Sequence, residues 1–217
     1  MINYHIVSTG SQGNAVVVNN NVLIDCGVPF RDLQGHYRAL KLVLLTHIHG
    51  DHFYRPCIRA LASQRPGLRF GCGKWLVDPL LNCGIPAENI DVLETDKCAN
   101  YGGFQVVPFL LTHDVPNQGY RIHFRDGSKM VYATDTSSLS GISAPNYDLY
   151  LIEANHEEAE IRERIAQQRA DGAFPVAQRA TQNHLSKERA DDFIYRNIGA
   201  NGVYEYLHRH QKKEVVN

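Results

Sequence analysis

Three histidines and one aspartate fall within six residues of each other in the stretch LTHIHGDHF, residues 45–53. The aliphatic run KLVLL leads into them and has the continuous apolar character of a buried strand. Four such polar groups on one short loop would crowd and desolvate one another, which is costly unless a partner compensates. A divalent metal ion is the first candidate, because imidazoles and carboxylates are common ligands of such ions.

Other polar residues of the same types follow predicted strands later in the chain. His113 and Asp114 follow FQVVPFLLT, Asp135 follows KMVYAT, and His208 follows GVYEYL. In layered α/β folds the carboxyl ends of strands share one edge, and ligands collect at that edge. The sequence therefore predicts that these side chains converge with the histidine loop.

This inventory suits two divalent cations. His47 and His49 alternate on an extended stretch and can point to the same side, toward one cation. Asp51 and His52 would face the other cation, past the bend at Gly50. A carboxylate can bridge two cations, and Asp135 is the natural bridge.

The elements that must position these residues are short strands and helices in two similar rounds. The strands are expected at INYHIV, NAVVVN, NVLID, KLVLLT, LRFGC, IDVLE, FQVVPFLLT, GYRIHF, KMVYAT, DLYLIE and GVYEYL. Helices are expected over about 31–40, 53–64, 74–82, 157–169 and 186–197, with Ser186 as an N-cap. Two rounds of this kind predict an α/β fold, in which two sheets pack together with helices outside. No linker or repeat divides the chain, so we expect residues 1–217 to form a single domain.

The composition excludes several classes of protein. With 43% hydrophobic and 21% charged residues and a net charge of −1, the chain is typical of a globular protein and has no overall basic field for nucleic acid. No apolar run approaches the roughly 18 residues that span a bilayer, and no secretory signal is visible at the start. The five cysteines are odd in number and form no CxxC pair, so we expect reduced, mostly buried thiols. These features predict a cytoplasmic protein with no membrane partner.

The stretch His47-Ile48-His49-Gly50-Asp51-His52 contains the HxHxDH hallmark of the metallo-β-lactamase superfamily, which the chain resembles over nearly its whole length. The resemblance implies a four-layer αββα sandwich, with two mixed sheets packed face to face, and two divalent metal ions, Zn²⁺ or Mn²⁺. It also implies that His113, Asp135 and a C-terminal histidine complete the ligand set. Asp25, in the LIDCG turn, would accept a hydrogen bond from the histidine loop.

Two histidines compete for the last ligand position. His208 ends a strand, as the other ligands do, whereas His184 lies just before a predicted helix. In the phosphodiesterase branches of the superfamily, such as tRNase Z, one histidine opens a helix and the metal-binding histidine ends the next strand. By similarity, His208 is assigned to the metal and His184 to substrate phosphate or proton donation.

Four further stretches resemble the WalJ/YycJ-type group, which is related to tRNase Z: STGSQGNAVVV, FLLTHDVPNQGYRI, LIEANHEE and NHLS. Members of that group are regarded as metal-dependent DNA exonucleases, so the resemblance implies phosphodiester hydrolysis at DNA ends by a metal-activated water. Asp51 would orient that water or take its proton, and His184 would protonate the leaving alkoxide. His156 is a second catalytic candidate, and a solvated residue at the start of a helix is the equal alternative. The chain departs from the group at Asn183 and in the final segment HRHQKK.

Two other functions stay open at this stage. One is a compact phosphodiesterase for small nucleotides, cyclic nucleotides included, and the other is a non-catalytic metal-binding module. Basic residues gather toward the end of the chain and could line a phosphate path, although scattered surface charge explains them as well: Arg179, Lys187, Arg189, Arg196, Arg209, Lys212 and Lys213. The oligomeric state is also open, a homodimer included.

Overall fold

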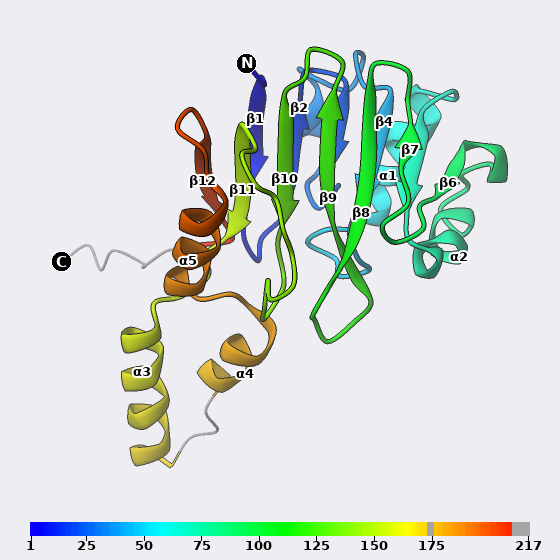
Figure 1. Cartoon of the computed structure of the whole chain (residues 1–217). Helices are drawn as coiled ribbons and strands as arrows, with labels where there is room; N and C mark the ends of the chain where they lie inside the picture. Colours follow the sequence, from blue (N-terminus) through cyan, green and yellow to red (C-terminus); the bar gives the residue numbers. More distant parts are fainter. Residues whose placement is uncertain (173–175, 210–217) are drawn as a thin grey trace.

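Two six-stranded mixed sheets form the centre of the protein in the computed structural model, which describes residues 1–172 and 176–209 (Figure 1). The first sheet has the order β1-β2-β3-β4-β5-β6, and the second has the order β12-β11-β10-β9-β8-β7. Each sheet therefore comes from one half of the chain, as the two rounds of strands in the sequence predicted.

The sheet of the first half begins with antiparallel pairing and continues with parallel pairing: β1, β2 and β3 pair antiparallel, and β3 to β6 pair parallel. Its strands are β1 Tyr4–Ser8, β2 Ala15–Val18, β3 Val22–Ile24, β4 Leu42–Leu45, β5 Arg69–Cys72 and β6 Ile90–Val92. Its helical elements are η1 Phe30–Leu33, α1 Arg55–Gln64, η2 Lys74–Leu76, α2 Val77–Leu81 and η3 Ala87–Asn89.

The second half repeats the scheme, because β7 to β10 pair antiparallel and β10 to β12 pair parallel. Its strands are β7 Ala99–Asn100, β8 Phe104–Leu111, β9 Asn117–Phe124, β10 Lys129–Ala133, β11 Leu149–Glu153 and β12 Val203–Leu207. Its helices are α3 Glu158–Ala170, α4 Val176–Asn183 and α5 Lys187–Asn197. A tight turn at residues 125–127 joins β9 to β10 as a hairpin.

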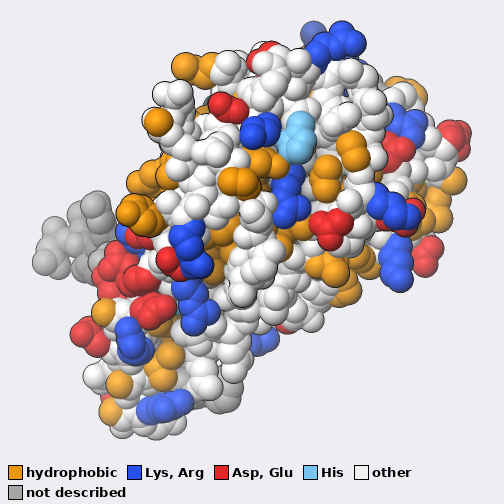
Figure 2. Space-filling model, viewed as in Figure 1, with side chains coloured by type: hydrophobic (Ala, Val, Ile, Leu, Met, Phe, Trp, Pro, Cys, Tyr) orange, Lys and Arg blue, Asp and Glu red, His pale blue; other side chains and the backbone are white. Residues whose placement is uncertain are grey.

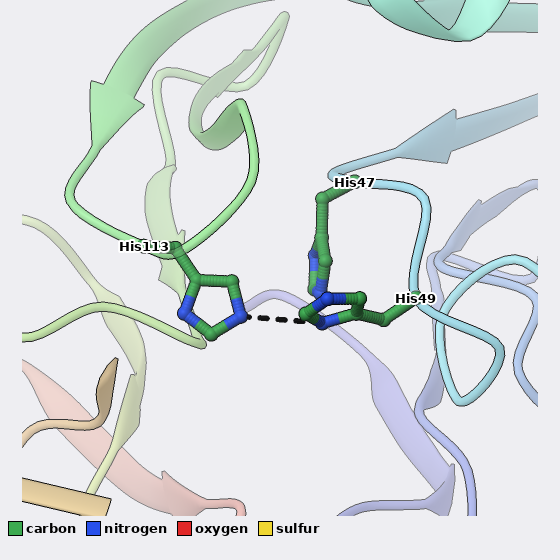
Figure 3. A group of neighbouring side chains, drawn as sticks. All are labelled: His47, His49 and His113. Atoms are coloured by element: carbon green, nitrogen blue, oxygen red, sulfur yellow. Dashed lines mark hydrogen bonds between the residues drawn. The ribbon is translucent and has the colours of Figure 1, made fainter. Parts of the chain in front are cut away.

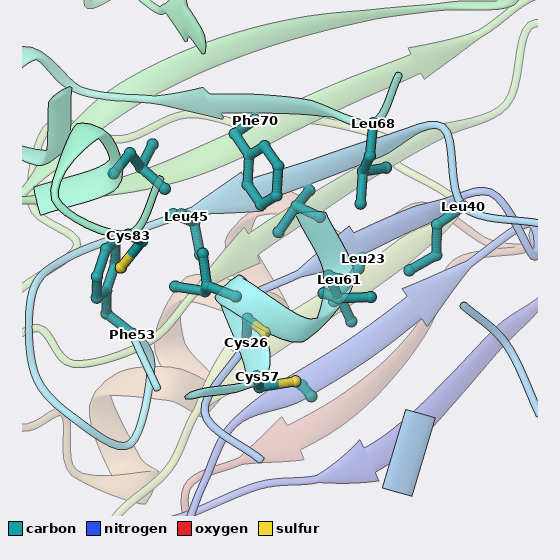
Figure 4. Close-up of a cluster of buried hydrophobic side chains, with 14 of the residues drawn as sticks. Leu23, Cys26, Leu40, Leu45, Phe53, Cys57, Leu61, Leu68, Phe70 and Cys83 are labelled. Atoms are coloured by element: carbon teal, nitrogen blue, oxygen red, sulfur yellow. The ribbon is translucent and has the colours of Figure 1, made fainter. Parts of the chain in front are cut away.

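The central strands are apolar on both faces, since each sheet is covered on both sides. In β4, Leu42 and Leu44 face the other sheet, whereas Val43 and Leu45 pack toward α1. Figure 4 shows this outer cluster, in which Leu61 and Cys57 of α1 lie against the strands. On the far side, a third cluster lies between the second sheet and α5. Three buried clusters between four layers confirm the αββα sandwich.

The strands are predicted better than the helices. Residues 31–40 form only the short helix η1 followed by turns, because Gly35 weakens a helix at its middle. Residues 74–82 divide into η2 and α2 rather than forming one helix, and neither β7 nor α4 was expected. Ser186 does cap α5, since its side chain accepts a hydrogen bond from the Arg189 N–H at 3.2 Å. In the described part of the chain, no helix is both long and apolar enough to cross a bilayer.

Candidate metal centre

The carboxyl ends of β4 and β8 bring three histidines together (Figure 3). His47 and His49 follow β4, and His113 follows β8 from the other sheet. The rings of His47 and His49 lie 4.8 Å apart between centroids, and His113 Nε2 lies 3.3 Å from His49 Nδ1. Each of the three offers a ring nitrogen within 4.8 Å of the others. The convergence predicted for these residues is therefore present.

Asp135, at the end of β10, lies at the centre of a second group. Its Oδ2 is 2.9 Å from His52 Nε2 and 3.2 Å from His208 Nδ1. Asp51 borders the same group, since its Oδ2 lies 3.6 Å from His52 Nε2. Asp135 also lies close enough to His47 to share a ligand set with it. This position, between the two groups of histidines, is the one expected of a bridging carboxylate.

A third group adds Glu153 and His184 to Asp135 and His208. Glu153 is fully buried at the end of β11, and its Oε1 lies 2.6 Å from His184 Nδ1. Burial disfavours the charged form of His184, but the hydrogen bond and charge of Glu153 raise its pKa above the ordinary value. Sequence reasoning gave Glu153 no role, although a carboxylate directly after the apolar run DLYLI is the same signal that marked Asp135.

Asp25 holds the histidine loop in place through hydrogen bonds. Its Oδ2 lies 2.7 Å from His52 Nδ1 and accepts a hydrogen bond from the Tyr132 hydroxyl at 3.1 Å. Its Oδ1 accepts from the backbone N–H of Thr46 at 2.9 Å. The contact expected from the LIDCG turn is therefore present, and it directs His52 Nε2 toward Asp135.

The loop between β1 and β2 also contacts the site. Asn14 Nδ2 lies 2.8 Å from His52 Nε2 and 3.4 Å from Asp51 Oδ2. The hydroxyl of Thr9 accepts a hydrogen bond from the His208 N–H at 2.7 Å. The STGSQGN stretch thus contacts both ends of the ligand set, a role that the sequence comparison did not assign.

Burial and opposite charges shift the pKa values of the central groups. Burial lowers the pKa of His47, and the neighbouring charge of His52 lowers it further. Burial also opposes the charged form of His52, but the carboxylates of Asp135 and Asp25 raise its pKa well above the usual range. In turn, His52 and His208 hold the pKa of Asp135 well below its usual range despite burial.

The donor set fits divalent cations. His47 Nε2 is buried and has no hydrogen-bond partner, while its Nδ1 lies 2.9 Å from the Thr46 hydroxyl. An orphaned buried nitrogen of this kind costs about 1–3 kcal/mol unless a ligand compensates. Neutral imidazoles and ionised carboxylates are the forms that bind metal. The protein therefore presents ligands of the right type at one edge.

His156 lies near this centre but outside the three groups of ligand atoms. It is half-buried, and its Nδ1 is 3.4 Å from Asn155 Oδ1. Burial lowers the pKa of His156, and His184 lowers it further. Asp114, which follows His113, is exposed and lies 3.4 Å from His49 Nε2.

A four-layer αββα sandwich with His/Asp clusters at one edge defines a metallohydrolase of the metallo-β-lactamase class. The family model described as "Beta-lactamase superfamily domain" matches residues 20–190, which is more than half of the chain, and the chain belongs to this family. Among curated proteins, none matches the chain.

Solved structures share the fold at low sequence identity. The metallo-β-lactamase fold protein YhfI from Bacillus subtilis aligns with a TM-score of 0.73 at 17% identity, over 97% of this chain and 88% of that one. The short form of human tRNase Z also gives a TM-score of 0.73, at 18% identity over 97% and 93% of the two chains. A long-form RNase Z from yeast gives 0.66 at 13% identity and is covered over 37% of its length. These likenesses confirm the fold.

Proposed function

We propose that the protein hydrolyses phosphodiester bonds at DNA ends, as the WalJ/YycJ-type group is regarded as doing. The observation that carries this proposal is the pairing of His184 with Glu153 beside Asp135. This pairing places an imidazole whose charged form is favoured by a buried carboxylate beside the candidate metal-ligand side chains. A hydrolase that expels an alkoxide needs such an acid next to the scissile bond. All of these groups lie within the one sandwich, which supports a single domain over residues 1–217.

Two divalent cations, Zn²⁺ or Mn²⁺, are the cofactors that we propose. His47, His49 and His113 would hold one cation, and Asp51, His52 and His208 would hold the other, with Asp135 between them. When bound, such ions lower the pKa of water and neutralise charge that develops at phosphorus. His47 and His52 are held in place by Thr46 and Asp25, which limits their choice of rotamer.

The remaining steps belong to side chains of this protein. Asp51, whose carboxylate is only partly buried, would orient the attacking water or accept its proton. His184 would donate the proton at its Nε2 to the leaving oxygen, because Nδ1 is engaged by Glu153. The His184 side chain is 21% exposed and that of His208 is 6% exposed, so His184 is the one more open to substrate.

His156 would contact substrate rather than donate a proton. Burial lowers its pKa, which favours the neutral form at pH 7, and its Nδ1 lies 3.4 Å from Asn155 Oδ1. His156 and His184 line the same small cavity, which is where the leaving group would emerge.

The distribution of surface charge agrees with a substrate that is a small nucleotide or the end of a DNA strand. On the face shown in Figure 2, Lys and Arg side chains alternate with Asp and Glu side chains and form no large basic area. Arg189, one of the basic residues noted in the sequence, is engaged with the Ser137 carbonyl at 3.2 Å. Lys212 and Lys213 lie outside the described residues. Long-range capture of duplex DNA would therefore be weak.

One assay separates the three functions considered. Protein loaded with Zn²⁺ or Mn²⁺ is incubated with labelled duplex DNA, single-stranded DNA, RNA and cyclic nucleotides in parallel. We expect shortening of DNA from its ends. Cleavage of cyclic nucleotides alone would replace the proposal with the small-nucleotide phosphodiesterase. RNA is included because two structural neighbours are named tRNase Z and RNase Z. No cleavage by metal-loaded protein would favour the binding module.

A further inference from the structure

A cavity of about 370 Å³ lies outside the metal-ligand groups. It is enclosed by α3 and α4, which lie side by side below the sandwich in Figure 1, and by the chain just after β11 and β12. Asn155 and Arg209 line it from those two strand ends. Its volume falls in the range of about 300–1,000 Å³ that is typical of small-molecule sites.

The cavity adjoins the proposed catalytic centre. A smaller cavity of about 160 Å³ is lined by His184, and His156 and Ile161 contribute to the walls of both cavities. A molecule with one end at His184 can therefore extend past His156 into the larger cavity. No residue assigned to metal or to proton transfer lines the larger cavity.

The wall toward the helices is aliphatic and made of small side chains. Ile161 of α3 is joined there by Ala177 and Ala180 of α4. Alanines at these two positions leave room for a flat ring, and an aliphatic wall stabilises a ring face by removing it from water. This part of the cavity favours an uncharged, flat group.

The cationic groups of the cavity are already engaged. Lys187 Nζ lies 2.7 Å from Asp191 Oδ2, and the guanidinium of Arg209 lies 4.6 Å from the centroid of the Tyr206 ring. Glu157 and Glu160 also line the cavity, and they would repel a second phosphate. The carboxylate of Glu157 can instead accept a hydrogen bond from the amino group of a heterocycle.

We propose that this cavity binds the base of the nucleoside next to the scissile phosphate, with the phosphate at the metal centre. The proposal deepens the proposed function and rests on it. It explains why a mixed-charge, partly aliphatic cavity lies beside a centre built for anions.

Direct binding measurements test whether the base is recognised, and they do not require catalysis. Metal-loaded wild-type protein is titrated with deoxyadenosine 5′-monophosphate, deoxyribose 5-phosphate and inorganic phosphate by calorimetry. We expect the nucleotide to bind at least tenfold more tightly than the two ligands without a base. Equal affinities for all three would overturn the proposal.

A variant that fills the cavity localises the effect. Ala180→Phe is expected to remove the tenfold advantage of the nucleotide and to leave the affinity for inorganic phosphate unchanged. Ala166→Phe is the matched control, because Ala166 is exposed on α3 and lines neither cavity. If the advantage survives in Ala180→Phe, the base lies elsewhere and the assignment is wrong.

Kinetics on matched esters separate this proposal from the hydrolase itself. Thymidine 3′- and 5′-(p-nitrophenyl phosphate) are compared with methyl p-nitrophenyl phosphate, which has the same leaving group and no base. In wild type we expect at least one thymidine ester to have a tenfold lower KM, and in Ala180→Phe we expect that difference to disappear. Hydrolysis of all three esters at equal KM would contradict the base site and uphold the hydrolase. Nucleotide binding without hydrolysis of any ester would uphold the base site and contradict the hydrolase.

Discussion

His184 and His208 lie 4.9 Å apart between ring centroids and share Asp135 as a neighbour, yet their surroundings differ. His208 is buried, its backbone is held by Thr9 and Asn155, and it has a left-handed φ of +53°. His184 is more open and is oriented by Glu153. A buried, rigid position suits a metal ligand, and a more exposed one suits contact with substrate.

Alanine substitutions at these two positions are expected to have different effects. His208→Ala should lower the bound metal measured by mass spectrometry, because a ligand is lost. His184→Ala should keep the metal and lower kcat by about 10²–10⁴, the usual contribution of a general acid. Equal loss of metal in both variants would contradict the assignment.

In the proposed reaction, Glu153 acts through His184, which its Oε1 contacts at 2.6 Å. Glu153→Gln keeps the shape of the side chain but removes its charge, so His184 is held less firmly in its protonated form. We expect kcat to fall about tenfold or more in steady-state assays, while KM and metal content stay within twofold of wild type. Substitution of the exposed Glu163 by Gln is the control and should change nothing. A large loss of metal in Glu153→Gln would instead place Glu153 among the ligands.

At the scale of elements, the histidine loop is docked on two other loops by close backbone contact. Gly27 lies where a Cβ atom would come within 1.7 Å of the Asp51 carbonyl oxygen, and Asn14 N donates to that same oxygen at 2.7 Å. The loops after β1, β3 and β4 can pack this closely only because Gly27 has no side chain.

Gly27→Ala is therefore expected to displace the loop that carries Asp51 and His52. The free energy of unfolding should fall by about 1–3 kcal/mol or more, as for other overpacked sites, and metal affinity should fall with it. Urea unfolding and metal titration measure the two effects. Gly35→Ala, where a Cβ meets nothing within 4 Å, should be nearly neutral, and a similar loss in both variants would refute the steric argument.

The hairpin of β9 and β10 contains a histidine whose protonation we expect to make the stability of the fold depend on pH. His123 Nε2 lies 2.6 Å from the Tyr147 hydroxyl, and burial, with the charges of Lys129 and Arg121, lowers its pKa. The unfolded chain, with a histidine pKa of about 6.5, then binds more protons than the folded chain, so stability falls as pH drops below that value. Urea unfolding at pH 7.5 and 5.5, with chelator in both buffers, should show a smaller difference for His123→Gln than for wild type. Identical differences would mean that His123 does not contribute.

At the scale of the whole molecule, the candidate ligand side chains come from both sheets. His47, His49 and His52 follow a strand of the first sheet, and His113, Asp135 and His208 follow strands of the second. A cation that binds both sets stabilises the contact between the sheets and the folded state as a whole.

Removal of metal should lower the melting temperature. At a free metal concentration about 1,000 times Kd, the stabilisation is about 4 kcal/mol. Thermal unfolding with and without chelator should show this as a clear downward shift in Tm. Asp135→Asn weakens both proposed sites and should respond much less to chelator. An unchanged wild-type Tm after verified metal removal would contradict a role of the metal in joining the sheets.

The local pattern of the sequence was enough to predict most of the strands, two packed sheets with helices outside, and most of the convergent side chains. Each metal-ligand candidate from His47 to His208 lies in the loop after a strand, and such strands end at a common edge once they are parallel. The Ser186 cap is equally local, because it depends on residues three apart. These features are predictable because their causes lie within a few residues.

The tertiary structure alone decided which distant groups are partners. The pairing of Glu153 with His184, the contact of Asn14 with His52, and the cavity between α3 and α4 depend on the order and register of strands far apart in the chain. That order is determined by the packing of two sheets and not by any short pattern.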